Sequence, residues 1–325
     1  MLVAIDMGSS TTRIAVGGKG LVLAEPTLLA DCCNLPQALA VGQAARPMQG
    51  KVPEHMAIYS PVQAGHLASP GAAQMLLRNL LQRVGASSWR RPAVRLVIPS
   101  QATPVERQQL RNALQSQGLV SLHSVSLPVA CAYGAFSSPT EGERLGVALL
   151  DIGSHVTEMS IVASDIVMRQ HISWGSSDLD RELRECLNQE FELEVSAAVS
   201  ERLKCSLGCF DPETQAGHEK LVGRERSTGL PVERELPTTP LAKALDNPLQ
   251  KLVELTRRML DQLPPLLAKD VLEKGIMLTG GGSLLRGLPA WLSQRLELPV
   301  TRAEDPQNCS VLGALKCPQH LCRDV

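Results

Sequence analysis

The sequence has few aromatic residues and almost no net charge, and both deficits argue against nucleic-acid binding. Tyr, Phe and Trp make up 2% of the 325 residues, which disfavours platforms that stack on bases. The 32 Lys and Arg residues nearly balance the 33 Asp and Glu residues, so the formal net charge is -1. Without an overall positive charge, the protein as a whole has no electrostatic attraction for the phosphate backbone of a nucleic acid. We therefore predict no nucleic-acid partner.

Long apolar runs and an N-terminal leader are also lacking. No apolar run approaches the ~20 residues of a membrane-spanning helix. A strand-like pattern begins at Leu2, without the basic and apolar segments of a secretory leader. The 9 cysteines are an odd number, which favours reduced thiols over a disulfide framework. The sequence thus predicts a cytoplasmic protein, and its length accommodates two domains.

Cysteine and histidine gather near the C-terminus, where a metal site has to be considered. The residues concerned are Cys309, Cys317, His320 and Cys322. Their spacing matches none of the usual zinc patterns. The spacing argues against a metal site there, although the sequence alone leaves the question open.

Two stretches of the chain, residues 2–16 and 146–162, repeat one pattern. In each, an apolar run ends in an aspartate, passes a glycine and small polar residues, and resumes as alternating apolar and polar residues. This pattern predicts a strand, a tight turn and a second strand. The aligned pairs are Asp6 and Asp151, Gly8 and Gly153, Ser9 and Ser154, and Thr12 and Thr157.

The two turns have the chemistry of a polyphosphate site. A glycine-containing turn directs backbone N–H groups and hydroxyls at phosphate oxygens, and a carboxylate at the strand end can hold Mg²⁺ through water. A third pattern is the predicted strand 275–279, which runs into Gly280-Gly281-Gly282-Ser283. Its glycines let the backbone approach a flat ligand without an obstructing Cβ. Together the three patterns predict nucleotide binding.

Helix starts divide the rest of the chain into repeated β/α units. Ser69-Pro70, Thr103-Pro104 and Asn247-Pro248 each place a capping residue before a proline, which the first helical turn tolerates. Glu106, three residues after Thr103, completes a capping box. We therefore predict an α/β protein with helices beginning at these three points.

The order of two hairpins and a strand followed by three glycines resembles the actin-like ATPase superfamily, and the individual motifs resemble the bacterial MreB/Mbl family. The motifs are Asp6-Met7-Gly8-Ser9-Ser10-Thr11-Thr12, Glu25-Pro26, Val41-Gly42-Gln43-Ala44-Ala45, Ile98-Pro99-Ser100, Glu201-Arg202-Leu203-Lys204, the stretch 275–288 and Leu298-Pro299-Val300. The resemblance covers nearly the whole chain. It implies a duplicated actin-like (ribonuclease H-like) α/β fold, with two domains around a nucleotide cleft and a smaller subdomain inserted in each.

The resemblance also implies domain limits. The first half is expected at 1–148, with an inserted subdomain at about 31–64 and the C-terminal residues 309–325 packing back on it. The second half is expected at 149–308, with an inserted subdomain at about 178–242.

The function implied is that of an ATP-binding cytoskeletal protein whose filaments lie on the inner face of the cell membrane and organise wall synthesis to set cell shape. Its partners would be other copies of the chain, the membrane surface and membrane proteins of wall elongation. Asp6 and Asp151 would face Mg²⁺. The nucleotide-binding residues implied are Gly8, Ser9, Ser10, Thr11, Gly153, Ser154, His155, Val156, Glu201, Arg202, Leu203, Lys204, Gly280, Gly281, Gly282 and Ser283. From spacing alone, Glu201 and Lys204 also fit a surface ion pair.

Two departures from the family pattern predict weak ATP hydrolysis. Family members have an acidic residue where this chain has Leu127, and a hydroxyl residue where it has Val156. Loss of groups that position the attacking water removes orders of magnitude in phosphoryl transfer. The sequence therefore leaves the catalytic residues unknown. His155 either replaces the missing groups as a general base or only makes the loop bulkier.

Membrane contact is expected at the stretch 85–92, where Trp89 is followed by Arg90 and Arg91. A Trp ring suits the bilayer interface, and arginines are attracted to anionic lipid. The competing interpretation is that Trp89 covers a nearby edge of the core.

Two other classes of function share this superfamily. A sugar or acetate-type kinase needs a catalytic carboxylate near the γ-phosphate, and no spare carboxylate stands at the expected place. A nucleotide-binding adaptor of the FtsA or PilM type would recruit partners without polymerising, and a pelleting assay separates it from a filament protein.

Overall fold

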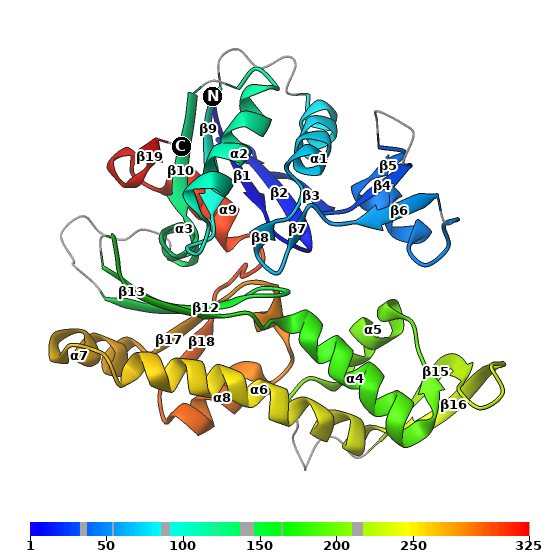
Figure 1. Cartoon of the computed structure of the whole chain (residues 1–325). Helices are drawn as coiled ribbons and strands as arrows, with labels where there is room; N and C mark the ends of the chain where they lie inside the picture. Colours follow the sequence, from blue (N-terminus) through cyan, green and yellow to red (C-terminus); the bar gives the residue numbers. More distant parts are fainter. Residues whose placement is uncertain are drawn as a thin grey trace. The chain divides into compact units, whose positions relative to one another are not determined.

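The computed structural model describes residues 1–32, 38–53, 55–85, 92–119, 121–136, 146–163, 165–209 and 217–324. The chain forms two compact units (Figure 1). Unit 1 comprises Met1–Leu145, Val162–Val167 and Ala303–Val325, and unit 2 comprises Gly146–Ile161 and Met168–Arg302. Each unit contains most of one main sheet. Among the described residues, no helix is long and apolar enough to cross a membrane.

The main sheet of unit 1 has six strands in the order β19-β10-β9-β1-β2-β3. In chain order they are β1 (Leu2–Met7), β2 (Thr11–Val16), β3 (Gly20–Pro26), β9 (Ala93–Ile98), β10 (Ser121–Ser126) and β19 (Arg323–Asp324). The first three strands form an antiparallel meander, whereas β9 and β10 run parallel to β1. Parallel neighbours need crossover connections, and helices supply them here.

Helices α1 (Pro70–Arg83) and α2 (Pro104–Gln115) begin where the sequence predicts. The Ser69 hydroxyl accepts a hydrogen bond from the Ala72 N–H, and Thr103 forms the expected capping box with Glu106. Buried leucines of both helices share one core with the sheet strands. Local capping chemistry therefore fixes both helix starts.

Helices α3 (Leu127–Ala135) and α9 (Cys309–Lys316) pack with their backbones in contact. A Cβ on Gly313 would lie 1.8 Å from the Ala130 carbonyl oxygen, and one on Gly134 would lie 1.9 Å from that of Cys309. No side chain fits at either position. This contact brings the C-terminal segment against the sheet of unit 1.

Two small sheets complete unit 1. One has the order β5-β4-β6 and the other is the pair β7-β8. Their strands are β4 (Leu29–Cys32), β5 (Ala40–Val41), β6 (Met56–Tyr59), β7 (Val62–Gln63) and β8 (His66–Leu67). Two short 3₁₀ turns, η1 (Gly42–Ala44) and η2 (Arg46–Met48), follow β5, and a third, η5 (Gln319–Leu321), follows α9.

The main sheet of unit 2 has the order β13-β12-β11-β17-β18. Its strands are β11 (Val147–Ile152), β12 (Thr157–Ala163), β13 (Asp165–Ile172), β17 (Ile276–Thr279) and β18 (Val300–Arg302). Strand β17 pairs parallel with both β11 and β18. The ends of β11 and β17 therefore lie side by side, with Asp151 in register with Thr279.

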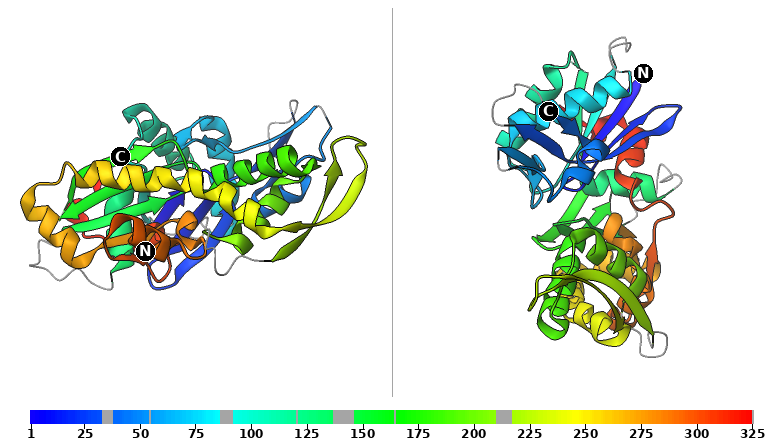
Figure 2. Two further views of the ribbon diagram at one scale, coloured as in Figure 1. Left: turned by 90° about the horizontal axis from the view of Figure 1, so that it is seen from below. Right: turned by 90° about the vertical axis from the view of Figure 1, so that its right-hand side faces the viewer.

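Helices and a third small sheet surround this sheet. The helices are α4 (Ser176–Phe191), α5 (Ala197–Leu207), α6 (Thr238–Leu260), α7 (Pro265–Lys274) and α8 (Leu288–Leu296), with the 3₁₀ turn η4 (Gly281–Leu284) after β17. The small sheet has the order β14-β15-β16. In it, β15 (His218–Glu225) and β16 (Pro231–Pro237) form a hairpin, yellow-green in Figure 2, and β14 (Leu193–Glu194) pairs with β15.

The predicted helix start at Asn247-Pro248 is wrong. Helix α6, yellow in Figure 1, begins ten residues earlier at Thr238 and contains Pro248 in its interior. An interior proline costs about 3 kcal/mol through a lost hydrogen bond and a steric clash. The helix nevertheless continues because its apolar face is buried along its whole length, at Leu241, Leu245, Leu249 and Leu252 among others. Burial of each leucine is worth about 2 kcal/mol, so the four leucines together exceed the cost of the proline.

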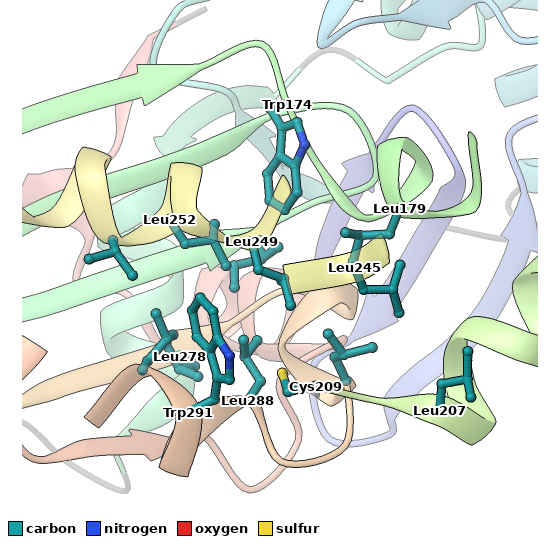
Figure 3. Packing of buried hydrophobic residues seen from close by; sticks show 14 of the residues in the cluster. Trp174, Leu179, Leu207, Cys209, Leu245, Leu249, Leu252, Leu278, Leu288 and Trp291 are labelled. Atoms are coloured by element: carbon teal, nitrogen blue, oxygen red, sulfur yellow. The ribbon is translucent and has the colours of Figure 1, made fainter. Parts of the chain in front are cut away.

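The core of unit 2 packs these leucines against two tryptophans. Trp174 and Trp291 are both buried in the cluster shown in Figure 3, with Leu278 and Leu288 beside Trp291. The Trp291 indole donates a hydrogen bond to Asp246 at 3.0 Å, so its one polar group is satisfied. This core supports the strands that end in the second predicted phosphate turn.

Candidate functional site

The first predicted phosphate turn joins β1 to β2 in unit 1. The Gly8 N–H donates to the Thr11 carbonyl at 3.1 Å, which closes a tight turn. A buried hydroxyl pair braces it, because Thr27 donates to the Gly8 carbonyl at 2.7 Å and lies 2.9 Å from the Thr12 hydroxyl. Since the single Thr27 proton goes to Gly8, Thr12 must donate to Thr27. The turn is thus held by one side chain on β2 and one on the segment after β3.

Asp6 stands at the end of β1, directly before this turn. The Ser310 hydroxyl, from α9, donates to Asp6 Oδ2 at 2.5 Å. Burial raises the pKa of the Asp6 carboxyl, while the Ser310 hydrogen bond and the nearby Arg13 guanidinium oppose that rise. Arg13 is itself held by Asn308 at 3.0 Å. Burial disfavours the charged form of this carboxyl, and a nearby cation would stabilise that form. Asp6 therefore fits a Mg²⁺ site.

The predicted phosphate-lining residues of this turn differ in exposure. Ser10 is exposed, whereas Gly8, Ser9 and Thr11 are half-buried. The Ser9 hydroxyl accepts a hydrogen bond from the Gly65 N–H at 3.3 Å, and the Ser9 carbonyl accepts one from Ser60 at 3.1 Å. The segment after β6 therefore positions the middle of the turn.

The second predicted phosphate turn joins β11 to β12 in unit 2 and repeats the first. The Gly153 N–H donates to the Val156 carbonyl at 3.0 Å, as Gly8 does to Thr11. Ser154 and Val156 are half-buried and His155 is exposed. The Ser154 hydroxyl lies 3.0 Å from His155 Nδ1. The sequence alignment of the two turns is therefore also an alignment of their hydrogen bonds.

The beginning of α4 is attached to this second turn. The backbone N–H groups of Ser176 and Ser177 donate to the Gly153 and Ser154 carbonyls, both at 2.9 Å. A Cβ on Gly175 would lie 2.5 Å from the Ser154 carbonyl carbon, so only glycine fits there.

Asp151 is held by the strand that leads into the glycine loop. The Thr279 hydroxyl, at the end of β17, donates to Asp151 Oδ1 at 2.9 Å. Gly280 has φ +78°, and a Cβ there would lie 2.5 Å from the Ile152 carbonyl oxygen. A Cβ on Gly282 would lie 2.3 Å from Ile152 Cγ2. Unit 2 thus brings Asp151, the second turn and the loop 280–283 together.

The rest of that loop is closed on itself. The Ser283 hydroxyl donates to the Gly280 carbonyl at 2.7 Å, and Ser283 is fully buried. Gly281 is exposed. Of this loop, the backbone around Gly280 and Gly281 is therefore the part that a ligand can reach.

The residues predicted on α5 have unequal access to a ligand. Glu201 and Arg202 are exposed, whereas Leu203 belongs to the core of unit 2. Lys204 is buried, and its ammonium donates to Asp180 at 2.8 Å and to the Ser176 carbonyl at 3.1 Å. Burial raises the pKa of the Asp180 carboxyl, and Lys204 opposes that rise. Lys204 therefore ties α5 to the first turn of α4, next to the second phosphate turn.

Leu127, at the predicted place of a catalytic acid, is the first residue of α3 and is half-buried. Neither it nor Val156 has a side chain that binds or activates water. Trp89, Arg90 and Arg91, the predicted membrane contact, lie outside the described residues. In the described ranges, no group of three or more His, Cys, Asp or Glu residues is placed to hold a metal ion, and this includes the C-terminal cysteines.

Sequence reasoning missed the two hydroxyls that hold the aspartates. Ser310 and Thr279 lie 304 and 128 residues away from their partners, so no local pattern relates them. One available signal was the strand 275–279, which ends in Thr279 directly before the glycines. Ser310 had no such signal.

The chain matches known proteins over nearly its whole length. The family model described as MreB/Mbl protein matches residues 1–323. The cell shape-determining protein MreB of Escherichia coli (strain K12) is 32% identical over 320 residues, covering 96% of this chain and 92% of that protein. The cell shape-determining protein Mbl of Bacillus subtilis (strain 168) is 27% identical over 313 residues, with 96% and 93% covered.

Solved structures give the same result for the fold. MreB5 of Spiroplasma citri bound to AMPPNP superposes with a TM-score of 0.89 at 28% identity, covering 96% of this chain and 94% of that one. The MamK double helical filament has a TM-score of 0.79 at 21% identity, with 97% of both chains covered. The predicted duplicated actin-like fold is confirmed.

Proposed function

The chain belongs to the MreB/Mbl family, and from this membership we propose that it is an ATP-binding cytoskeletal protein that assembles into filaments and helps to set cell shape. The observation that supports nucleotide binding best is the repeated turn. In each copy the glycine N–H donates the same backbone hydrogen bond, and the preceding aspartate accepts a hydrogen bond from a hydroxyl. A repeated anion-binding turn suits a polyphosphate. The Spiroplasma citri relative has been solved with AMPPNP and with ADP.

Mg²⁺ would be held through water by Asp6 and Asp151 and would neutralise charge on the phosphates. Asp6 suits this role because burial raises the pKa of its carboxyl despite Ser310 and Arg13, so a cation would stabilise its charged form. The hydroxyls of Ser310 and Thr279 would keep the two carboxylates in place. The nucleotide-binding residues are those of the two turns, the glycine loop and the exposed part of Glu201–Lys204.

Self-assembly and position in the cell are the finer part of the proposal. Copies of the chain would be the first partners, followed by the membrane surface and membrane proteins of wall elongation. The protein would act in the cytoplasm, at the inner face of the membrane. Family membership supports this assignment, and the relatives are named for determining cell shape.

Sedimentation tests the assembly directly. With ATP and Mg²⁺ the wild type should pellet above a critical concentration, and Asp151→Ala should remain in the supernatant. Without nucleotide, both proteins should stay soluble. A wild type that binds ATP yet never pellets at any concentration would instead be an adaptor, which refutes the filament proposal while leaving nucleotide binding intact.

Hydrolysis should be slow, because Leu127 and Val156 cannot position water. Phosphate release by the wild type should be low, and Leu127→Glu combined with Val156→Thr should raise it. The matched control Leu127→Gln with Val156→Thr offers similar volume without a carboxylate. Brisk release by the wild type would show that another group, such as His155, positions the water.

Membrane contact is assigned to Trp89, Arg90 and Arg91. One Trp and two arginines bind weakly, so attachment should depend on many copies along a filament. Changing all three residues to Ala should release filaments from anionic liposomes without preventing pelleting with ATP. Equal flotation of variant and wild type with the liposomes would rule this segment out as the anchor.

A further inference from the structure

The C-terminal segment of unit 1 makes a compact turn after α9. Cys317 ends the helix, Pro318 follows, and the 3₁₀ turn η5 leads to Cys322. The Leu321 N–H donates to the Pro318 carbonyl at 3.2 Å, and the Cys322 N–H donates to that of Gln319 at 3.0 Å. These bonds turn the chain back, so that Cys322 lies on the same side of the turn as Cys317.

The two thiols meet at this turn. The Cys317 and Cys322 sulfurs lie 3.6 and 3.5 Å from one oxygen, the Pro318 carbonyl. Both thiols thus donate to the same carbonyl oxygen, which places the two sulfurs on one side of the turn. Cys317 is 2% exposed, whereas Cys322 is partly exposed. The pair therefore consists of one partly accessible thiol and one buried thiol that share a hydrogen-bond acceptor.

Arg95 fixes this turn from the sheet. Its buried guanidinium, on β9, donates to the carbonyls of Ala314 and Cys317 and to the Gln319 side chain. The bonds reach both the end of α9 and the start of η5. Arg95 thus holds the turn in the conformation that places both sulfurs beside the Pro318 carbonyl.

Five further cysteines have side chains that the structure describes, and none of the five combines access with a second thiol on the same acceptor. Cys131, Cys186, Cys209 and Cys309 are buried, and Cys205 is exposed on α5. Burial raises the pKa of the Cys186 thiol to about 11 and that of Cys209 to about 12, so both stay protonated and inert at neutral pH.

We propose that Cys317 and Cys322 are an oxidisable dithiol, which a peroxide converts into an intrachain disulfide that closes the C-terminal turn. The Cys322 thiolate attacks a peroxide oxygen, the O–O bond breaks, and a sulfenic acid and hydroxide form. The Cys317 sulfur then attacks the Cys322 sulfur, its proton passes to the leaving oxygen, and water departs. Two thiols lose two electrons in all, and hydrogen peroxide becomes two waters.

Burial supports this order of events. It raises the pKa of the Cys317 thiol to about 12, an effect that Cys322 reinforces and Arg95 opposes. Cys317 is therefore protonated at neutral pH and unsuited to attack peroxide first. The disulfide would join the end of α9 to β19, which pairs with β10 at Ser124 and His123. Oxidation would thereby fasten the beginning of the last strand to the end of α9, independently of whether nucleotide binds.

Peptide mass spectrometry tests the proposal on the full-length protein. Trypsin cleaves after Lys316 and Arg323, so both sulfurs fall in one peptide. After brief treatment with hydrogen peroxide and alkylation, that peptide should be unalkylated and about 2 Da lighter, and dithiothreitol should restore two alkylation sites. Disulfide formation should exceed oxidation of the exposed Cys205 by at least about tenfold. Full alkylation of the peptide while Cys205 oxidises would overturn the proposal.

Two variants test the order of the steps. Cys322→Ser, a change at a partly exposed position, should leave Cys317 as an unmodified thiol. Cys317→Ala should let a sulfenic acid accumulate at Cys322, where a 1,3-diketone reagent traps it. Trapping at Cys317 in the first variant, or none at Cys322 in the second with a native circular dichroism spectrum, would contradict the assignment.

Discussion

The two Asp-x-Gly turns have the same hydrogen bonds but different supports. In unit 1, Asp6 is held by Ser310 from α9, the C-terminal helix. In unit 2, Asp151 is held by Thr279 from β17, a neighbouring strand of the same sheet. Each aspartate therefore depends on a segment far away in the chain. The comparison shows that the duplication preserved the geometry of the turn and not the element that supports it.

The difference extends to the buried threonine after each turn. Thr12 and Thr157 are both fully buried. Thr12 donates to Thr27, which in turn braces Gly8, whereas the Thr157 hydroxyl has no hydrogen-bond partner in the described part of the chain. The first turn is thus secured by a hydroxyl chain that the second turn lacks.

The largest effect is expected from Gly313→Ala, which removes the support of the first turn alone. The new Cβ would lie 1.8 Å from the Ala130 carbonyl oxygen. Relief of this clash requires the backbones of α3 and α9 to move apart. We expect a loss of about 3 kcal/mol in the free energy of unfolding, measured by urea denaturation. Gly71→Ala in α1 is the control. Its Cβ meets nothing within 4 Å, so it should stabilise by about 0.5 kcal/mol. Equal midpoints for Gly313→Ala and wild type would show that α9 does not support unit 1.

The threonine pair should respond to one substitution with opposite signs. Thr12→Val removes the donor to Thr27 and should cost about 1 kcal/mol in the free energy of unfolding. Thr157→Val replaces an unpartnered buried hydroxyl with a methyl group and should be neutral or stabilising by up to about 1 kcal/mol. Denaturation curves for the two variants measure both effects. A similar loss in both variants would mean that the turns are braced alike.

The smallest effect concerns the charge of Asp6. Because burial raises the pKa of this carboxyl above its ordinary 3.8, folding disfavours its charged form. The resulting penalty is absent at low pH, develops as pH rises from 3.8 through the raised pKa, and remains at pH 7. Without nucleotide or Mg²⁺, Asp6→Asn should therefore raise the urea midpoint at pH 7, and the gain should shrink toward pH 4. A gain that stays constant over this range would rule out desolvation of the charge as its cause.

The local parts of the fold were predictable from the sequence, and the long helix of unit 2 was not. The hairpins around Gly8 and Gly153 and the helix starts at Ser69 and Thr103 depend on neighbours within a few residues, and all are confirmed. The start at Asn247 is wrong because burial along α6 outweighs the local cost of Pro248. Tertiary packing there overrides the capping signal.

The site was predictable in its turns and not in their supports. Spacing identified both aspartates and the glycine loop, yet the hydroxyls of Ser310 and Thr279 come from distant segments. The ion pair of the buried Lys204 with the half-buried Asp180 was missed as well, since the two residues lie on different helices. Assignment of the nucleotide contacts remains a prediction, which binding experiments can decide.

Titration calorimetry with ATP tests the central claim most directly, namely that the chain binds Mg²⁺–ATP and needs the aspartate before each turn to do so. The wild type should bind one ATP per chain in the presence of Mg²⁺. Asp6→Ala and Asp151→Ala, one in each turn, should each weaken that binding by at least about 100-fold, while Gly71→Ala should bind as the wild type does. A wild type that binds neither ATP nor ADP would contradict the claim, and so would an aspartate variant whose Mg²⁺-dependent affinity is unchanged.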